Sequence, residues 1–382
     1  MSVIERDLTY FVLPSDFNSL PGSSLTSFTL VSGPKTRFQG FEWNLSFPLS
    51  NAYRILLTGP GRPRPPHDNV KTPKDPADFI PFTLLSLDRQ NSHAVFSFPC
   101  AQEKLQLRLW WSYQIFSEIW HDNRLVLRDL QARPYGLTEH GVIRHWKLDR
   151  ERVHLGLGEK AAPLDLTGRK FVMHATDAAL YDAYRTDPLY KHTPFLISTP
   201  RPNANGEKGL TYAIYHATNS IATWDIGAEV DYPSGGHSKR YLQDWGGLEE
   251  WVLLGRQVDD VVETFSRLAG RPRLVGRDWL GYLGSTMLLA DQENAQELLE
   301  GWPDLCKQHD VPCSAMHLSS GFTADERTGA RWVFHMNKKR YPDFKHMVGV
   351  FHKAGMRIVP NVKPCKFVAR VGLVVYLRVS IL

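Results

Sequence analysis

The chain has 382 residues, of which 42% are apolar and 12% aromatic, so it is long enough to bury two hydrophobic cores. Lysine and arginine number 45 against 40 aspartates and glutamates, with no long basic run, which argues against a nucleic-acid-binding protein. No stretch approaches the ~20 apolar residues that span a bilayer, and the apolar run Phe11 to Leu13 is too short for a secretory leader.

The four cysteines, Cys100, Cys306, Cys313 and Cys365, form no C-x-x-C pair and have no histidines at zinc-binding spacing. We therefore predict buried free thiols, no metal and no cofactor. Free thiols also favour a reducing, cytoplasmic location. The oligomeric state is left open.

Residues 25 to 255 consist of short β-rich runs separated by Gly, Pro, Asn and Asp, a rhythm typical of a β-sandwich. The strongest predicted strands are Leu105 to Trp111, Leu125 to Leu130, Thr211 to His216 and Glu250 to Leu254. The proline-dense run Gly59 to Pro76 cannot supply the hydrogen bonds of a strand and is predicted to be a long surface loop.

Beyond Gln257 the pattern changes to alternating helices and strands, which predicts a parallel α/β unit. A helix spaced on Val258, Val261, Val262, Phe265 and Leu268 comes first, and Gly270-Arg271-Pro272 ends it. We then expect an extended Trp279 to Ser285, a helix carrying Leu298, Leu299, Trp302 and Leu305, a strand Pro312 to Leu318, a helix carrying Phe344, Met347, Val348 and Phe351, and a strand Met356 to Val362.

Several motifs, in a fixed order, resemble glycoside hydrolase family 31, the α-glucosidases and α-xylosidases. In the first half these are the Gly156-Leu157-Gly158-Glu159 turn, Asp177, and Asp187 to Lys191 followed by Pro194-Phe195. In the second half they are Glu249 to Tyr282, which is similar to the bridge into the catalytic barrel, then Asp310 to Phe322 and Gly355 to Pro364, which look like its second and third strands.

The resemblance implies a galactose-mutarotase-like β-sandwich followed by an incomplete (β/α)8 barrel. We divide the chain into a sandwich at 1–255, a connecting helix and linker at 256–275, a partial catalytic barrel at 276–365 and an atypical apolar tail at 366–382. The tail is β-branched and nearly uncharged, and we hypothesise that it arises from a shifted or unspliced reading frame.

Retaining hydrolysis needs two carboxyl groups about 5 Å apart, and in the family these are aspartates after the fourth and sixth barrel strands. Neither position is found here, so we expect no catalytic residue and an inactive chain. The barrel part has other acids, Asp291, Glu293, Asp325, Glu326 and Asp343, and their positions indicate helix caps and solvated charges.

The resemblance implies that Asp177 reaches from the sandwich toward the sugar, although an Asx turn or helix cap would also suit it. Ser319 and Ser320 stand where many members carry an acidic pair, and could either donate to sugar oxygens or form a simple turn. Lys363, Tyr181 and Trp332 complete the predicted substrate-binding set. The expected partner is an α-linked oligosaccharide or glycoside.

Two functions remain open from the sequence. One is a fragment of a retaining α-glycosidase of the α-glucosidase type. The other is a non-catalytic carbohydrate-binding or scaffold protein built on the sandwich. The many aromatic residues, including eleven Trp and fourteen Tyr, would suit stacking on sugar rings or the filling of sandwich cores.

Overall fold

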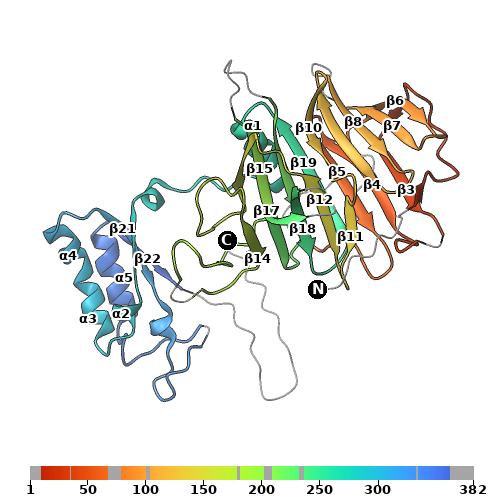
Figure 1. Cartoon of the computed structure of the whole chain (residues 1–382). Helices are drawn as coiled ribbons and strands as arrows, with labels where there is room; N and C mark the ends of the chain where they lie inside the picture. The colour runs from red at the N-terminus through yellow and green to blue at the C-terminus, as the bar shows by residue number, and fades with distance from the viewer. Residues whose placement is uncertain are drawn as a thin grey trace. The chain divides into compact units, whose positions relative to one another are not determined.

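The computed structural model describes residues 10–34, 36–67, 79–99, 104–178, 181–201, 209–231, 236–332 and 334–361. The chain divides into two compact units, Met1–Arg271 and Pro272–Leu382, which we describe separately (Figure 1). The apolar tail at 366–382, Lys363, Cys100 and Cys365 lie outside the described residues.

The first unit is built from three antiparallel sheets. The largest has the order β1 (Phe11–Val12), β3 (Ser27–Ser32), β4 (Glu42–Leu49), β5 (Ala52–Thr58), β19 (Leu248–Gly255), β16 (Thr211–His216), β15 (Phe195–Pro200) and β13 (Arg152–Gly156). The second has the order β10 (Arg124–Arg128), β9 (Phe116–His121), β8 (Leu105–Trp110), β7 (His93–Ser97), β6 (Phe82–Asp88) and β2 (Ser24–Leu25). The third has the order β11 (Tyr135–Leu137), β12 (Val142–Lys147), β18 (Gly236–Gln243), β17 (Ala222–Asp231) and β14 (Lys170–Met173).

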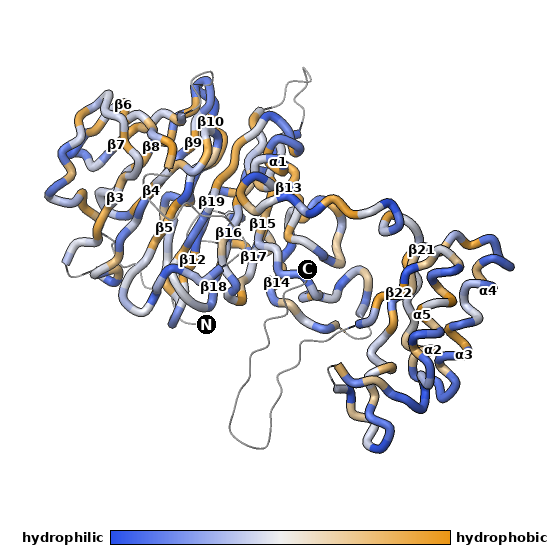
Figure 2. Tube along the Cα trace, turned by 180° about the vertical axis from the view of Figure 1, so that it is seen from behind, coloured by the Kyte–Doolittle hydropathy of each residue, from blue (hydrophilic) through white to orange (hydrophobic). Residues whose placement is uncertain are grey.

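The main core lies between the sheets, because alternate residues of each strand turn inward. On β8, Leu105, Leu107 and Leu109 are almost wholly buried. They share one hydrophobic cluster with residues of all three sheets. In Figure 2 hydrophobic stretches lie along the strands of this unit. The predicted sandwich is therefore confirmed, and all four of its strongest predicted strands are present as β8, β10, β16 and β19.

A buried ionic cluster crosses the core. Arg144 on β12 lies 2.7 Å from Asp129 and 3.2 Å from Glu250 on β19, with side-chain exposures of 2% or less. His216 on β16 stacks on Tyr241, with ring centroids 3.6 Å apart. Removing one member would leave an uncompensated charge in a dry interior, which is strongly destabilising.

A second cluster of buried polar side chains lies between the strand β18 and the strands β13 and β16. The Lys239 ammonium donates to the Tyr212 hydroxyl at 2.5 Å. The Arg152 guanidinium lies over the same ring, 4.9 Å from its centroid. Lys239 is fully buried, and burial lowers its pKa.

The helix α1 (Val258–Ala269) covers the outer face of the largest sheet, as its apolar spacing predicts. The Asp260 carboxylate accepts from the amides of Arg256 and Gln257, which fastens the first turn. Phe265 stacks on Phe195 of β15 at 4.4 Å between centroids. The helix therefore belongs with the sandwich unit.

The described part of the proline-rich loop, 59–67, holds no strand, as predicted, and 68–76 lie outside the described residues. It is tied to the sheets rather than free. Arg62 donates to the carbonyl groups of Gly141 and Thr138 at 3.0 and 2.8 Å. Arg64 donates to both carboxylate oxygens of Glu249 at 2.6 and 2.8 Å.

The second unit contains a parallel sheet with the order β20 (Tyr282–Thr286), β21 (Cys313–Leu318) and β22 (Arg357–Pro360). The helices α2 (Met287–Ala290), α3 (Ala295–Glu300), α4 (Trp302–Gln308) and α5 (Phe344–Lys353) accompany it, and the short helices η3 (Arg277–Leu280) and η4 (Ser320–Thr323) flank it. One cluster joins the sheet and helices, including Met316, Leu299, Met347 and Phe351. Cys306 and Cys313 are buried free thiols, as predicted.

Two predicted elements of this unit are wrong in detail. The expected extended run from Trp279 begins as the helix η3, because the Trp279 amide bonds back to the Gly276 carbonyl at 3.0 Å, and the strand starts only at Tyr282. The single helix expected across residues 298 to 305 is two helices, since Gly301 ends α3 and Pro303 lies in the first turn of α4.

The alternation of β20, β21 and β22 with helices confirms the predicted partial barrel, and within the described residues the barrel is not closed. No helix in the described ranges has the length and apolarity that crossing a membrane requires.

Candidate functional site

The motifs of the first unit meet in one loop assembly between β13 and β15. Gly156, Leu157 and Gly158 all have positive φ, at 107°, 61° and 72°. A Cβ on Gly156 would lie 2.4 Å from the Phe195 carbonyl oxygen, and one on Gly158 would lie 2.9 Å from Thr193. The turn needs glycine because it packs directly against Thr193 to Phe195. This contact explains why the two motifs occur together.

A buried ion pair fastens the same assembly. The Lys160 ammonium donates to Asp187 Oδ1 at 2.6 Å and to the Val172 carbonyl at 2.7 Å. The Val172 amide in turn donates to Asp187 Oδ2 at 2.5 Å. The Lys160 side chain is only 3% exposed, and burial lowers its pKa despite the carboxylate. Asp187 is thus a structural clamp at the start of its motif.

The Lys160–Asp187 pair anchors the loop on which Asp177 lies exposed. The Thr176 amide bonds to the Leu189 carbonyl at 3.0 Å, and Leu189 is buried, so the chain on both sides is anchored. Asp177 is exposed and accepts a hydrogen bond from the Tyr190 hydroxyl. That bond raises the pKa of Tyr190. Asp177 therefore binds a tyrosine, and among the described residues no helix follows it that it could cap.

Three tyrosines follow Asp177 in the sequence, and their side chains are exposed. Tyr181 and Tyr190 are each 57% exposed and Tyr184 is 80% exposed. A phenol ring and a carboxylate on one loop suit the binding of a sugar, since the ring packs on C–H bonds and the carboxylate accepts from hydroxyls. Tyr184 and Tyr190 were not among the substrate-binding residues predicted from the sequence, although the tyrosines that follow Asp177 were a visible signal.

In the second unit, Ser319 and Ser320 follow β21 at the carboxyl end of the sheet, where barrel enzymes carry their chemistry. Ser319 is half-buried. Ser320 is 7% exposed, and its hydroxyl lies 3.3 Å from Arg331 Nη1. The Ser320 hydroxyl therefore already has a protein partner, whereas Ser319 precedes the turn of η4.

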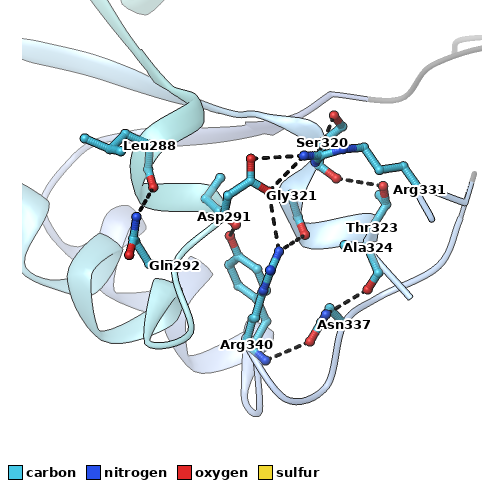
Figure 3. A network of polar contacts seen from close by, with 12 residues as sticks. Leu288, Asp291, Gln292, Ser320, Gly321, Thr323, Ala324, Arg331, Asn337 and Arg340 are labelled. Carbon is cyan, nitrogen blue, oxygen red and sulfur yellow. Dashed lines mark hydrogen bonds and ion pairs between the residues drawn. The ribbon is translucent and has the colours of Figure 1, made fainter. Parts of the chain in front are cut away.

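Figure 3 shows the network to which Ser320 belongs. Arg331 Nη2 lies 3.0 Å from both oxygens of Asp291, and Arg340 Nη1 lies 3.4 Å from Asp291 Oδ1 and from the Gly321 carbonyl. A Cβ on Gly321 would lie 2.3 Å from the Ala290 carbonyl oxygen. The network binds the segment after β20 to the segment after β21. Sequence reasoning missed Arg331 and Arg340, because their partner lies at least 40 residues away.

Trp332 is 45% exposed and follows this network, with its amide bonded to the Thr323 carbonyl at 3.1 Å. It remains a candidate stacking surface. Lys363 lies outside the described residues, so its predicted role is unchanged.

The acids singled out in the barrel part match the predicted helix caps and solvated charges only in part. Asp343 caps α5 by accepting from the His346 amide at 2.9 Å. Asp291 follows α2 and pairs with arginines instead of starting a helix. Among the described residues, Asp325, Glu326 and His335 bring ligand atoms within 4.8 Å of one another. Turn amides bonded to Asp325 and the Glu326–His335 contact at 3.1 Å account for that arrangement.

The fold defines a class of proteins in which a mutarotase-like sandwich is followed by a βα barrel. Residues 113–224 match the glycosyl hydrolase 31 N-terminal galactose mutarotase-like domain, and residues 272–375 match the glycosyl hydrolases family 31 TIM-barrel domain. The chain belongs to glycoside hydrolase family 31, which confirms the resemblance.

Two curated relatives show the extent of the match. Alpha-glucosidase 2 of Bacillus thermoamyloliquefaciens is 25% identical over 228 residues, which are 59% of this chain and 26% of the relative. Neutral alpha-glucosidase AB of Homo sapiens is 24% identical over 253 residues, which are 61% of this chain and 25% of the relative. The matched part of the chain thus spans about a quarter of the length of these relatives.

Two solved structures share the fold. The glucosidase II alpha subunit aligns with a TM-score of 0.72 at 12% identity, over 97% of this chain and 44% of that one. The Flavobacterium johnsoniae GH31 dextranase in complex with isomaltotriose aligns with a TM-score of 0.69 at 15% identity, over 94% of this chain and 39% of that one.

Proposed function

We propose that this chain is part of a retaining α-glycosidase of the α-glucosidase type, and that it has no hydrolytic activity by itself. The observation that carries the proposal is that one chain matches both the sandwich and the barrel domain of a family whose matched relatives are named α-glucosidases. A complete enzyme of this kind would act by double displacement through an oxocarbenium-like transition state.

The proposed inactivity follows from the position of the missing carboxylates. The family resemblance assigns them to the ends of the fourth and sixth barrel strands, and the second unit has three described strands. Among the described acids, Asp343 caps a helix and Asp291 and Glu326 form ion pairs, which does not suit a pair that must flank a glycosidic bond.

The test is release of nitrophenol from aryl α-glucosides by the purified chain. We expect no turnover above that of a mock purification. Activity that copurifies with the chain through further steps, and is independent of host glucosidases, would refute the proposed inactivity.

A second function, carbohydrate binding without catalysis, is favoured by the Asp177 loop. The Lys160–Asp187 pair and the Gly156–Glu159 turn, which both belong to the sandwich unit, anchor that loop. We propose that Asp177, Tyr190 and Tyr181 bind an α-linked glucoside or xyloside.

Calorimetry with maltose and with an α-xyloside tests this binding. We expect Asp177→Ala to weaken binding about tenfold or more, since a charged hydrogen bond is lost. Glu139→Gln is the matched control, because its side chain is 88% exposed on another loop of the same unit. Equal affinity of D177A and the unaltered chain would contradict the assignment.

A further inference from the structure

The outward face of the six-stranded sheet β10–β9–β8–β7–β6–β2 carries a second set of aromatic side chains, remote in sequence from the Asp177 loop. On β8 the leucines turn into the core, so Gln106, Arg108 and Trp110 lie on the opposite face. Strand pairing places Trp110 opposite Phe116 and Gln106 opposite Trp120. These strands belong to one sheet, of which Figure 1 labels β6, β7, β8 and β10.

The two tryptophans on this face are held by neighbouring side chains. Trp110 stacks on His93 of β7 with ring centroids 4.6 Å apart and packs against Phe116 at 5.3 Å. Arg108 lies over the Trp120 ring, 4.5 Å from its centroid. The Trp120 indole N–H donates to Glu118 Oε2 at 2.7 Å. Both indoles are half-buried, so each is fixed in place while part of its surface stays in contact with solvent.

The charges on this face balance. Arg128 pairs with Glu118 at 3.0 Å, and Arg108 and Asp88 add one charge of each sign. A charge-balanced surface offers no net attraction to an anion or a cation. The polar groups also interrupt the apolar area, which disfavours an apolar protein partner. A neutral ligand with alternating hydroxyl groups and C–H faces complements it best.

The spacing of the two rings sets the size of that ligand. Trp110 and Trp120 are four residues apart along the strand and one strand apart across the sheet. At ~3.3 Å per residue and ~4.8 Å between strands, their Cα atoms are separated by roughly 14 Å. A ligand that contacts both rings must be an extended chain, because a single sugar ring cannot reach from one to the other.

We propose that this face binds a neutral, extended oligosaccharide whose sugar rings stack on Trp110 and Trp120. That the sugar is α-linked glucose rests on the proposed function. The surface is a site separate from the Asp177 loop, and it would hold a polymeric substrate without taking part in bond cleavage.

Calorimetric titration of the whole chain with glucose, maltose and maltohexaose tests the proposal. We expect maltohexaose to bind at this face and glucose not to. Trp110→Ala and Trp120→Ala should each weaken maltohexaose binding about tenfold. Trp245→Ala, at a tryptophan that is 45% exposed in the loop between β18 and β19, should leave it unchanged.

A second measurement covers the case in which either alanine variant fails to fold. Fluorine NMR of the chain labelled with 5-fluorotryptophan, with resonances assigned from Trp110→Phe and Trp120→Phe, should show both indole signals moving on addition of maltohexaose. Unmoved signals, or unchanged affinity in both folded alanine variants, would overturn the proposal.

The Asp177→Ala variant separates this inference from the proposed function. Maltohexaose binding that survives D177A but not W120A supports the sheet face. Binding lost in D177A alone overturns the inference while supporting the loop site. Maltose binding that survives in both D177A and W120A would count against the loop site. The sheet face is then supported if W110A and W120A weaken maltohexaose binding, and overturned if they do not.

Discussion

At the scale of single residues, the loop that carries Asp177 depends on a few contacts that replace regular secondary structure. The Lys160–Asp187 pair, the Val172 amide and the glycines of the Gly156–Glu159 turn supply them. The residues of the motifs in this region thus divide into those that build the loop, such as Asp187, and those that it presents, such as Asp177 and Tyr190.

Lys160→Met should destabilise the first unit by roughly 3 kcal/mol, because it leaves the partly buried Asp187 carboxylate without its cation. Lys170→Met on neighbouring β14 is the control, since the Lys170–Glu229 pair is nearly half exposed at both ends and should matter by under about 1 kcal/mol. Urea titration followed by tryptophan fluorescence measures both. Equal losses of unfolding free energy in the two variants would show that burial of the Lys160–Asp187 pair does not explain its contribution.

Acid should weaken the first unit through two buried histidines. Burial, together with nearby cations, lowers the pKa of His145 and that of His154 to about 3. In the unfolded chain these rings take up a proton near pH 6.5, so the unfolded state binds more protons between about pH 6.5 and pH 3. Their contribution to stability is present above that interval and declines as the pH falls through it.

The expected decline approaches roughly 2.7 kcal/mol per pH unit for the two rings together within that interval. Urea titrations at pH 7.5, 6 and 5 measure it. His154→Gln should reduce the slope by about half, whereas His140→Gln, whose side chain is 68% exposed, should not change it. A slope unaffected by H154Q would refute the assignment.

At the scale of elements, sequence periodicity was enough to predict the strands β8, β16 and β19 and the helices α1 and α5. The strand β8 and the two helices each have one buried face, and burial imposes a periodicity that is visible in the sequence. The strands β16 and β19 are buried along almost their whole length and stand out as continuous runs rich in β-forming residues. The helix η3 and the break at Gly301 were missed because single backbone bonds and a proline decide them. The Asp291–Arg331–Arg340 network was missed because sequence does not reveal contacts between distant polar residues.

Two glycines of the second unit should respond oppositely to alanine. Gly321→Ala places a Cβ against the Ala290 carbonyl and the Asp291 carboxylate, and should destabilise the unit by roughly 1–3 kcal/mol. Gly349→Ala, inside α5 with open space around it, should stabilise it by up to about 1 kcal/mol. Thermal unfolding of the two variants gives the comparison. A neutral G321A would show that the network tolerates a shift of this turn.

At the scale of the whole molecule, the two units differ in how completely their sheets are covered. The sandwich encloses one large core and α1 closes its outer face. In the second unit β20 and β22 each have one strand partner among the described residues, so each leaves one edge for pairing. Unpaired edges of this kind promote association between chains.

We therefore expect the 382-residue chain to form oligomers or to be poorly soluble, and a chain ending at Arg271 to be monodisperse. Size-exclusion chromatography with light scattering compares the two at equal concentration. Monomeric behaviour of both chains would show that the second unit protects its edges.

Lys239 gives the sandwich a built-in reporter. The Lys239 amine is buried while β18 stays paired with its neighbours, and burial lowers its pKa. Amine acetylation followed by peptide mass spectrometry should therefore modify surface lysines at once and Lys239 only when the sheets separate. The rate at which the peptide that contains Lys239 is acetylated then measures how often the interior of the sandwich opens.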